Sequence, residues 1–393
     1  GDLKWSFNTI PEIGEDGHET YSDPDAYKRL GGANAWSGLT LDEERGILYA
    51  PTGSVSYDFY GGDRVGDNLF ANSIIALSAE TGNKIWHFQT VHHDVWDRDL
   101  PAPPILFDYS MNDSIIPSLA QVTKSGYIYL LNRITGKPLY KIIERPVPSK
   151  SNLEGEVLSK TQPIPSFPDP FSRQSLTKND INSFVIERER DSLIKIFTSL
   201  LKDDIFSPPS EEGTLIFPGF DGGAEWGGPA LDPINNKLFI NSNEMPWILT
   251  MKKVSNTDSQ GMNIYNKQCL MCHGIDSKGS GENPSILDLS SKYNFDELRS
   301  LVINGKGLMP GFKFLDDQKI EKIVDYIMNL KDGDKTNILA TNEEVFYTST
   351  GYNKFITNDG YPAINPPWGT LNSINLNTGK LDWKIPLGQT DIG

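Results

Sequence analysis

The sequence lacks several features that would each point to a class of protein. Its 393 residues include only two cysteines, and both lie in one short motif, so no disulfide framework is available. No run approaches the roughly 18 apolar residues that a membrane-spanning helix needs. Basic residues are outnumbered, with 36 Lys and Arg against 52 Asp and Glu and a formal net charge of −16. Binding to nucleic acid or to an anionic membrane is therefore not expected.

Glycine and proline are plentiful, with 35 and 26 copies, and aromatic residues make up 10% of the chain. This composition is typical of many short strands joined by turns. Three segments repeat an apolar strand, a Thr-Gly turn and a second strand closed by an aromatic residue. They span 75–86, 131–140 and 374–383, and residues 1–5 resemble the end of a fourth. Repeated hairpins of this kind are typical of β-propeller blades, with a β-sandwich as the alternative.

The pattern changes between about residues 254 and 335, where strand signals give way to apolar residues at helical spacing. We therefore predict propeller blades over residues 1–254, an inserted helical domain over 255–334 and the rest of the propeller over 335–393. A further irregular stretch, over 146–209, is predicted to contain one helix near residues 181–201.

The inserted domain contains Cys269-Leu270-Met271-Cys272-His273, the pattern of covalent attachment of a c-type haem. Two thiols three residues apart reach both vinyl groups on one edge of the porphyrin, and the imidazole of His273 then points at the iron. Met309, between Gly and Pro residues on a later loop, is the expected second iron ligand. A zinc site and a pair of structural cysteines are the alternatives, although the other four histidines lie outside this domain. The whole domain also resembles a monohaem cytochrome c.

The segment over residues 86–97, Trp-His-Phe-Gln-Thr-Val-His-His-Asp-Val-Trp-Asp, resembles the quinoprotein dehydrogenases that use pyrroloquinoline quinone (PQQ), and among them the membrane glucose dehydrogenase branch. Further matching motifs lie at 31–36, 66–72, 123–126, 222–228 and 360–370. The resemblance implies a mainly β fold, a partial eight-bladed propeller with an inserted α-helical cytochrome c domain. Because the chain is too short for eight blades and starts at Gly1 rather than Met, we expect a fragment or processed chain that lacks about the first third of the propeller and its closing strands.

The resemblance also implies roles for four residues. Asp97 matches the general base that removes the hydroxyl proton of the substrate, since hydride leaves a carbinol carbon only as that proton departs. Lys124 matches the cation beside the quinone carbonyls, Trp36 the indole stacked on the PQQ ring, and Asn241 an amide that contacts the cofactor. A turn aspartate, a solvated lysine, ordinary blade packing and a turn amide are the respective alternatives. His92 also belongs to the motif, but no chemistry requires it or its neighbour His93.

One position departs from the family pattern. Ser54 stands where alcohol-oxidising relatives have an Asn ligand to calcium, and a hydroxyl is a poorer ligand for a hard cation. A divalent cation, Ca²⁺ or Mg²⁺, is a further candidate cofactor that would bridge Asp97 and the quinone, with ligands that the sequence does not place.

These inferences predict an exported PQQ-dependent glucose or aldose dehydrogenase. Hydride from a small sugar would pass to PQQ, and electrons would then leave singly through haem c to a redox acceptor, either a quinone or another cytochrome. The resemblance to this family also implies that both cofactors mature in the periplasm or at the outer face of the cell membrane. An alcohol or polyol dehydrogenase is the first alternative, and a haem-bearing propeller that serves electron transfer alone is the second. The oligomeric state does not follow from the sequence.

Overall fold

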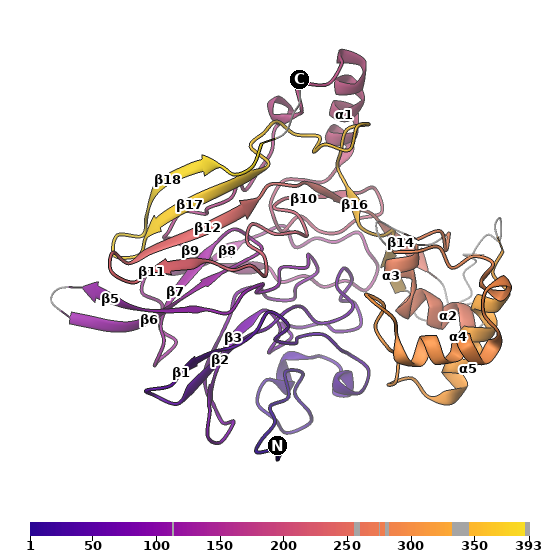
Figure 1. Cartoon of the computed structure of the whole chain (residues 1–393), viewed down its shortest axis with the longest axis horizontal. Coiled ribbons are helices and arrows are strands. Elements are labelled where there is room, and N and C mark those ends of the chain that lie inside the picture. The colour runs from indigo at the N-terminus through magenta and orange to yellow at the C-terminus, as the bar shows by residue number, and fades with distance from the viewer. Residues whose placement is uncertain (112–113, 255–259, 275, 280–282, 332–345, 390–393) are drawn as a thin grey trace. The chain divides into compact units, whose positions relative to one another are not determined.

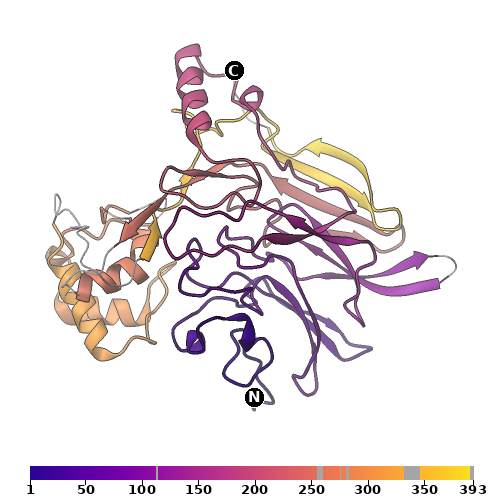
Figure 2. The same ribbon diagram turned by 180° about the vertical axis from the view of Figure 1, so that it is seen from behind.

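A computed structural model describes residues 1–111, 114–254, 260–274, 276–279, 283–331 and 346–389. The chain divides into two compact units (Figures 1 and 2). The first contains Gly1–Ile248 and Lys354–Gly393, and the second contains Leu249–Asn353. The two predicted domain boundaries, at 254/255 and 334/335, adjoin or fall within segments that lie outside the described residues.

The first unit is built from antiparallel sheets whose strands follow one another along the chain, as in propeller blades. The first sheet has the order β1 (Thr40–Asp42), β2 (Ile47–Pro51), β3 (Ser73–Ser78) and β4 (Lys84–Gln89), and the second has β5 (Ile105–Met111), β6 (Ser114–Val122) and β7 (Ile128–Asn132). The third has β11 (Ala230–Asp232), β12 (Lys237–Asn243), β17 (Gly369–Asn375) and β18 (Lys380–Pro386). The mainly β prediction is confirmed.

Smaller elements complete the first unit. They are the pair β8 (Ile142–Pro146) and β9 (Thr161–Pro165), the helix α1 (Glu187–Ser199), and the short strands β10 (Thr214–Ile216), β13 (Trp247–Leu249) and β16 (Asn353–Lys354). Helix α1 occupies most of the segment predicted to be helical. Leu193 and Phe197, on one of its faces, are buried, and this burial stabilises the helix.

The glycine of each repeated turn lies against an aromatic ring. Gly82 has a positive φ of 74°, and a Cβ there would be 2.6 Å from the ring of Trp5. Gly136 has a φ of 70°, and a Cβ there would be 2.7 Å from the ring of Trp86. Each indole N–H donates to a turn carbonyl, from Trp5 to Ala79 at 3.0 Å and from Trp86 to Arg133 at 3.1 Å. Only glycine satisfies both the left-handed backbone and the close approach of the ring.

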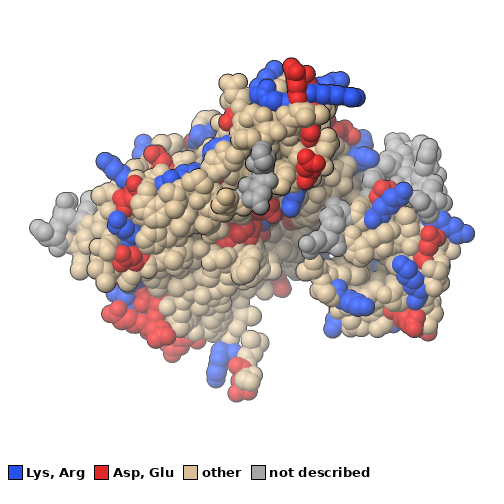
Figure 3. Space-filling model, turned by 45° about the horizontal axis from the view of Figure 1, so that its top comes forward, with Lys and Arg blue, Asp and Glu red and all other residues tan. Residues whose placement is uncertain are grey.

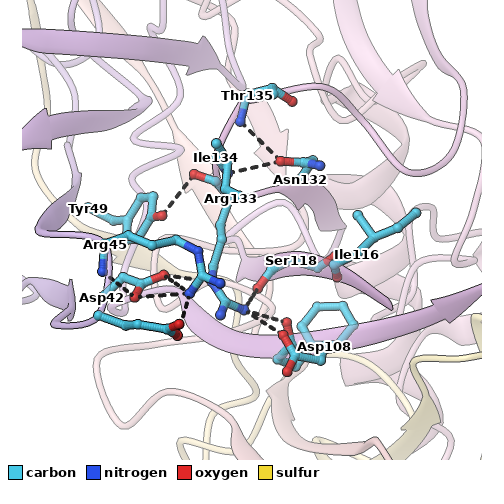
Figure 4. A network of polar contacts seen from close by, with 12 residues as sticks. Asp42, Arg45, Tyr49, Asp108, Ile116, Ser118, Asn132, Arg133, Ile134 and Thr135 are labelled. Carbon is cyan, nitrogen blue, oxygen red and sulfur yellow. Dashed lines mark hydrogen bonds and ion pairs between the residues drawn. The ribbon is translucent and has the colours of Figure 1, made fainter. Parts of the chain in front are cut away.

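Arg133 joins the first two sheets through a buried polar network (Figure 4). Its Nε lies 2.8 Å from Asp42 at the end of β1, and its Nη1 donates to the carbonyl of Phe107 on β5 at 2.7 Å. Burial raises the pKa of Asp42, but the hydrogen bond and charge of Arg133 outweigh it and hold the pKa below its ordinary value. The hydroxyl of Tyr49 donates to the Arg133 carbonyl at 2.8 Å.

The second unit interrupts the third sheet without disrupting it. Strands β12 and β17 are paired neighbours over seven residues, from Lys237↔Asn375 to Asn243↔Gly369, although the insertion separates them in the chain. In the order of the chain, the second unit is therefore inserted between the second and third strands of one sheet. Within it, β14 (Met251–Val254) pairs with β15 (Phe346–Ser349).

The second unit is otherwise helical, with α2 (Gln260–Gln268), α3 (Leu270–His273), α4 (Phe295–Asn304) and α5 (Asp317–Met328). Asn294 caps α4 with a reciprocal box to Glu297. Helices α2 and α5 approach closely at Gly261, where a Cβ would be 2.6 Å from the Cβ of Tyr326. The apolar residues predicted at helical spacing on α5 are buried, namely Ile320, Ile323, Val324 and Ile327. None of the helices in the described ranges has the length and apolar character to span a bilayer.

Candidate active site and haem-attachment site

Asp97 and Lys124 form a buried ion pair between neighbouring sheets. Asp97 lies in the loop after β4, and Lys124 lies in the turn between β6 and β7. Lys124 Nζ is 2.9 Å from Asp97 Oδ1, and the two side chains are 7% and 14% exposed. Burial raises the pKa of Asp97 well above its ordinary value, against the opposing charge of Lys124. Burial would lower the pKa of Lys124, but the charges of Asp97 and Asp99 outweigh it and raise that pKa.

Asp99 joins this pair to the indole of Trp36. The Trp36 Nε1–H donates to Asp99 Oδ2 at 3.0 Å, and Lys124 Nζ lies 3.6 Å from the same oxygen. The backbone N–H of Ser54 donates to Asp99 Oδ1 at 2.6 Å. Lys124 Nζ lies 5.9 Å from the centre of the Trp36 ring, whose side chain is 42% exposed. An indole anchored at its edge and open to solvent can receive a flat partner.

Sequence reasoning identified Trp36, Asp97 and Lys124, which the structure brings together, but it missed Asp99. The available signal was a second carboxylate two residues after Asp97. Asn241 is not joined to these residues by any hydrogen bond or ion pair that the structure describes. It is exposed on β12, opposite Leu371 of β17. Its predicted contact with a cofactor stays a prediction.

Carboxylates outnumber ammonium groups around Lys124. Burial and the charge of Asp99 raise the pKa of Asp58 to about 7. Burial likewise raises the pKa of Glu225, although Lys124 acts in the opposite direction. Arg64 and Lys124 both act to lower the pKa of Asp58, so these two cations partly offset the acidic charge. Among the described residues, no group of three or more His, Cys, Asp or Glu has the arrangement of a metal site.

Two fully buried side chains anchor the loop on either side of Asp97. Trp96 Nε1 donates to the carbonyl of Ser207 at 2.8 Å. The guanidinium of Arg98 donates to the carbonyls of Pro218 and Ile205 at 2.6 and 3.1 Å. The side chains before and after Asp97 are thus tied to a distant part of the chain, and Asp97 is held between them.

The histidines earlier in this loop are engaged elsewhere. His93 Nδ1 donates to the carbonyl of Gly66 at 2.8 Å, and its Nε2 lies 2.8 Å from Glu156 Oε1. His92 Nδ1 lies 2.6 Å from the side-chain oxygen of Gln89. In the part of the chain that the structure describes, neither histidine hydrogen-bonds to Asp97.

The haem-attachment motif consists of helix α3 and the residue directly before it. Cys269 is the residue before the helix, Cys272 lies within it, and His273 ends it. His273 Nδ1 is 2.9 Å from the carbonyl of Pro284, which can only accept a hydrogen bond. The proton therefore sits on Nδ1, and the Nε2 lone pair is available to a metal. The residues fit an attached haem, because neither Cys269 nor Cys272 forms a disulfide within the described residues and Cys269 lies in the apolar core of this unit.

Met309 lies in a tight loop after α4. The amide of Lys306 donates to the carbonyl of Met309 at 3.0 Å, and the amide of Met309 donates back at 3.1 Å. The Met309 side chain is partly buried against the same apolar cluster that contains Cys269. Met328, at the end of α5, packs against this cluster as well. The assignment of Met309 as an iron ligand stays a prediction.

Comparison with protein families matches most of the chain. Residues 1–280 and 293–392 match the family described as PQQ glucose/ethanol/alcohol dehydrogenase, beta-propeller domain. Residues 256–327 match the family described as cytochrome C oxidase, cbb3-type, subunit III. These matches support PQQ and haem c as the cofactors and confirm the predicted combination of a quinoprotein propeller and a cytochrome c domain.

Individual relatives are considerably longer than this chain. Quinate/shikimate dehydrogenase (quinone) of Acinetobacter baylyi is 29% identical over 99% of this chain and 39% of its own length. Quinoprotein glucose dehydrogenase A of Acinetobacter calcoaceticus is 34% identical over 63% of this chain and 31% of its own length. The chain thus spans about two fifths or less of these relatives.

Among solved structures, quinohemoprotein alcohol dehydrogenase from Comamonas testosteroni aligns with 98% of this chain and 41% of its own, with a TM-score of 0.51 and 18% sequence identity. At that identity the likeness concerns the fold alone.

Proposed function

The chain belongs to the PQQ glucose/ethanol/alcohol dehydrogenase β-propeller family, and on that premise we propose that the protein oxidises the carbinol group of a small sugar or alcohol with PQQ as the acceptor. The proposed substrate is an aldose such as glucose, oxidised to its lactone. Electrons leave through haem c to an external acceptor, a quinone or another cytochrome. The proposed location is the periplasm or the outer face of the cell membrane.

The buried pair of Asp97 and Lys124 carries this proposal. Its two side chains come from different turns, lie 2.9 Å apart and are almost shielded from solvent. A carboxylate whose pKa burial raises is a stronger base than an exposed one, and it suits removal of a hydroxyl proton. Lys124, held as an ammonium by Asp97 and Asp99, would stabilise negative charge that develops beside it.

The residues around this pair fit PQQ, a flat molecule with several carboxylates. The exposed face of Trp36 would stack on it, and Lys124 would contact its oxygen-bearing edge. When bound, PQQ supplies a two-electron acceptor, and haem c supplies a one-electron carrier. A divalent cation that bridges Asp97 and the quinone stays a prediction, since no group of three or more His, Cys, Asp or Glu among the described residues is arranged to hold one.

The named relatives leave two substrate classes open. One is named for glucose and another for quinate or shikimate, which are cyclic hydroxy acids. The sugar is favoured here because the motif over residues 86–97 resembles the glucose dehydrogenase branch. A polyol or alcohol dehydrogenase is the second candidate.

Steady-state assays of the full-length protein, loaded with PQQ and haem c, distinguish these candidates. Aldoses, quinate, glycerol and ethanol would be compared through kcat/KM with an artificial acceptor. We expect an aldose to give the largest value. A larger kcat/KM for quinate or for an alcohol would replace the aldose assignment and keep the reaction class. If none of these substrates reduced the acceptor, a propeller that serves electron transfer alone would be favoured.

A further inference from the structure

We propose that Asp94 is a positioning residue that holds the loop of Asp97 in its reactive conformation. The inference rests on the proposed function, since it assumes that Asp97 is the base. It concerns a different residue, which does not contact the Asp97 side chain in the described structure and is only 2% exposed.

The Asp94 carboxylate is the centre of a cluster of donors. Its Oδ1 accepts the backbone N–H of Trp96 at 2.9 Å. Its Oδ2 accepts the backbone N–H of Arg98 at 2.7 Å and the side-chain N–H of Asn72 at 2.8 Å. The hydroxyl of Ser54 donates to the same oxygen. Four groups from three segments of the chain therefore converge on one buried carboxylate.

Two of these donors lie directly before and after Asp97 in the chain. Asp97 has a φ of 57°, a left-handed conformation that costs an ordinary L-residue on the order of 1 kcal/mol. Asp94 accepts hydrogen bonds from the amides of both neighbours, Trp96 and Arg98. These two hydrogen bonds stabilise the loop and offset the cost of the left-handed conformation. The conformation in turn directs Asp97 toward Lys124, 2.9 Å away.

Asn72 and Ser54 extend this anchor toward the rest of the site. The Asn72 amide N–H also lies 3.1 Å from the carbonyl of Arg98, so Asn72 contacts both ends of the loop. The Ser54 hydroxyl also lies 2.9 Å from Asp99 Oδ1, the carboxylate that binds Trp36. Through Asp94, the base loop and the residues around Trp36 share one set of hydrogen bonds.

The chemistry of the cluster requires a carboxylate. Every group that contacts the two oxygens is a donor, so an acceptor-only side chain satisfies all of them. An asparagine would direct its own N–H groups at one of these donors, leaving a buried donor without a partner. Asp94→Asn changes almost no volume and is therefore the most specific substitution at this position.

The test compares Asp94→Asn with the wild-type protein in three ways. Hydrogen exchange followed by mass spectrometry, with the cofactor-free protein, reports on the amides of Trp96 and Arg98. Titration with PQQ counts competent sites. Turnover of the substrate that the wild-type protein oxidises, with deuterium at the carbinol carbon, reports whether hydride removal limits kcat.

We expect the exchange of the peptide over residues 94–99 to accelerate by about 10-fold or more, since two of its amides lose their acceptor. We expect kcat per PQQ site to fall by about 30- to 100-fold, with KM and PQQ affinity changed by less than about 3-fold, because a base displaced by about 1 Å loses that much rate. The deuterium isotope effect on kcat should rise. Asp42→Asn removes another buried carboxylate, one with no described hydrogen bond to residues 94–99, and should leave all three readouts unchanged.

Unchanged exchange, or a wild-type kcat and isotope effect per PQQ site, would overturn the proposal. If Asp94→Asn does not fold, Ser54→Ala removes one of the four donors and should change exchange and kcat in the same direction, and no change in either would overturn it equally. Asp97→Asn separates this inference from the proposed function. An active Asp97→Asn enzyme contradicts the base assignment, whereas an inactive one beside a normal Asp94→Asn enzyme contradicts only the role of Asp94.

Discussion

At the scale of single residues, buried hydrogen bonds join His93 to Glu156. The carbonyl of Gly66 can only accept, so His93 Nδ1 carries a proton. Its Nε2 faces Oε1 of Glu156, whose Oε2 accepts the N–H of Gly61 at 2.6 Å. Burial raises the pKa of Glu156, but the hydrogen bond and charge of His93 outweigh it and lower that pKa. Both partners are at most 1% exposed, so this is a buried histidine–glutamate pair.

Glu156→Gln should destabilise the folded protein by about 2 kcal/mol at pH 7, because an amide supplies only one of the two acceptor oxygens that bind the N–H groups of Gly61 and Val157. A carboxylate with a lowered pKa contributes stability above its unfolded pKa and loses it as the pH falls through the folded pKa. The difference from wild type should therefore be complete at pH 7 and shrink in acid below about pH 4. Urea unfolding at several pH values measures it.

Glu144→Gln is the matched control, because Glu144 faces His92 at 3.3 Å but is 54% exposed. Exposed pairs contribute little, so the control should change the free energy of unfolding by less than about 1 kcal/mol at every pH. Equal effects of the two substitutions would contradict the buried histidine–glutamate pair.

At the scale of elements, the glycine of each Thr-Gly turn contacts an aromatic ring from another segment of the chain, and Gly136 after β7 thereby contacts Trp86 of β4. Gly82→Ala should destabilise the protein by about 3 kcal/mol, because the new methyl would meet the Trp5 ring in a left-handed turn. Gly46→Ala is the control, since Gly46 also has a positive φ, 62°, but no atom lies within 4 Å of an added Cβ. It should cost only about 1 kcal/mol of backbone strain. Thermal unfolding of both variants tests this contact, and equal losses would contradict it.

The repeated hairpins and the helices were predictable because their periodicity lies within short segments. The partners of the aromatic rings were not. The sequence pattern pointed to Tyr140 as the aromatic residue of the second repeat, yet Phe167 lies against Gly379, and Tyr140 packs on Phe167 with ring centres 5.1 Å apart. Phe167, which comes from the irregular stretch over 146–209, therefore contacts the turn glycine, and no local sequence pattern indicates this contact.

The same limit applies to the candidate site. Each of the three residues identified from the sequence lies in a motif that resembles the family, namely Asp97, Lys124 and Trp36. The resemblance could therefore identify them. Asp99 and Asp94 act through contacts with Trp36, Ser54 and Asn72, which lie 22 to 63 residues away in the chain. Spacing alone cannot show which of several neighbouring acids turns inward. Only the folded loop assigns each carboxylate its donors.

At the scale of the whole molecule, acidic side chains gather along one lower edge of the face in Figure 3, while basic side chains are scattered over it. This distribution agrees with the net charge of −16. The two units carry different halves of the proposed chemistry. The first contains the Asp97–Lys124 pair, and the second contains the haem-attachment motif.

Met309→Leu tests the haem-bearing unit separately from the Asp97–Lys124 pair. Loss of the thioether ligand should lower the midpoint potential of the haem, since methionine ligation raises it, while the covalent attachment through Cys269 and Cys272 persists. Potentiometric titration of the haem spectrum measures the potential. Met328→Leu, on the core side of α5, should leave it unchanged. An unaltered potential in Met309→Leu would remove Met309 as the iron ligand.

We propose that Asp97 removes the hydroxyl proton of the substrate and that the electrons of this oxidation reach the haem. Rapid mixing of the full-length protein, loaded with PQQ and haem c, with substrate in the absence of an external acceptor tests it through the absorbance of reduced haem. The wild-type protein should reduce its haem, and Asp97→Asn, with PQQ still bound and the haem still reducible by dithionite, should do so at least about 100-fold more slowly. Equal rates of haem reduction in the two proteins would contradict the claim.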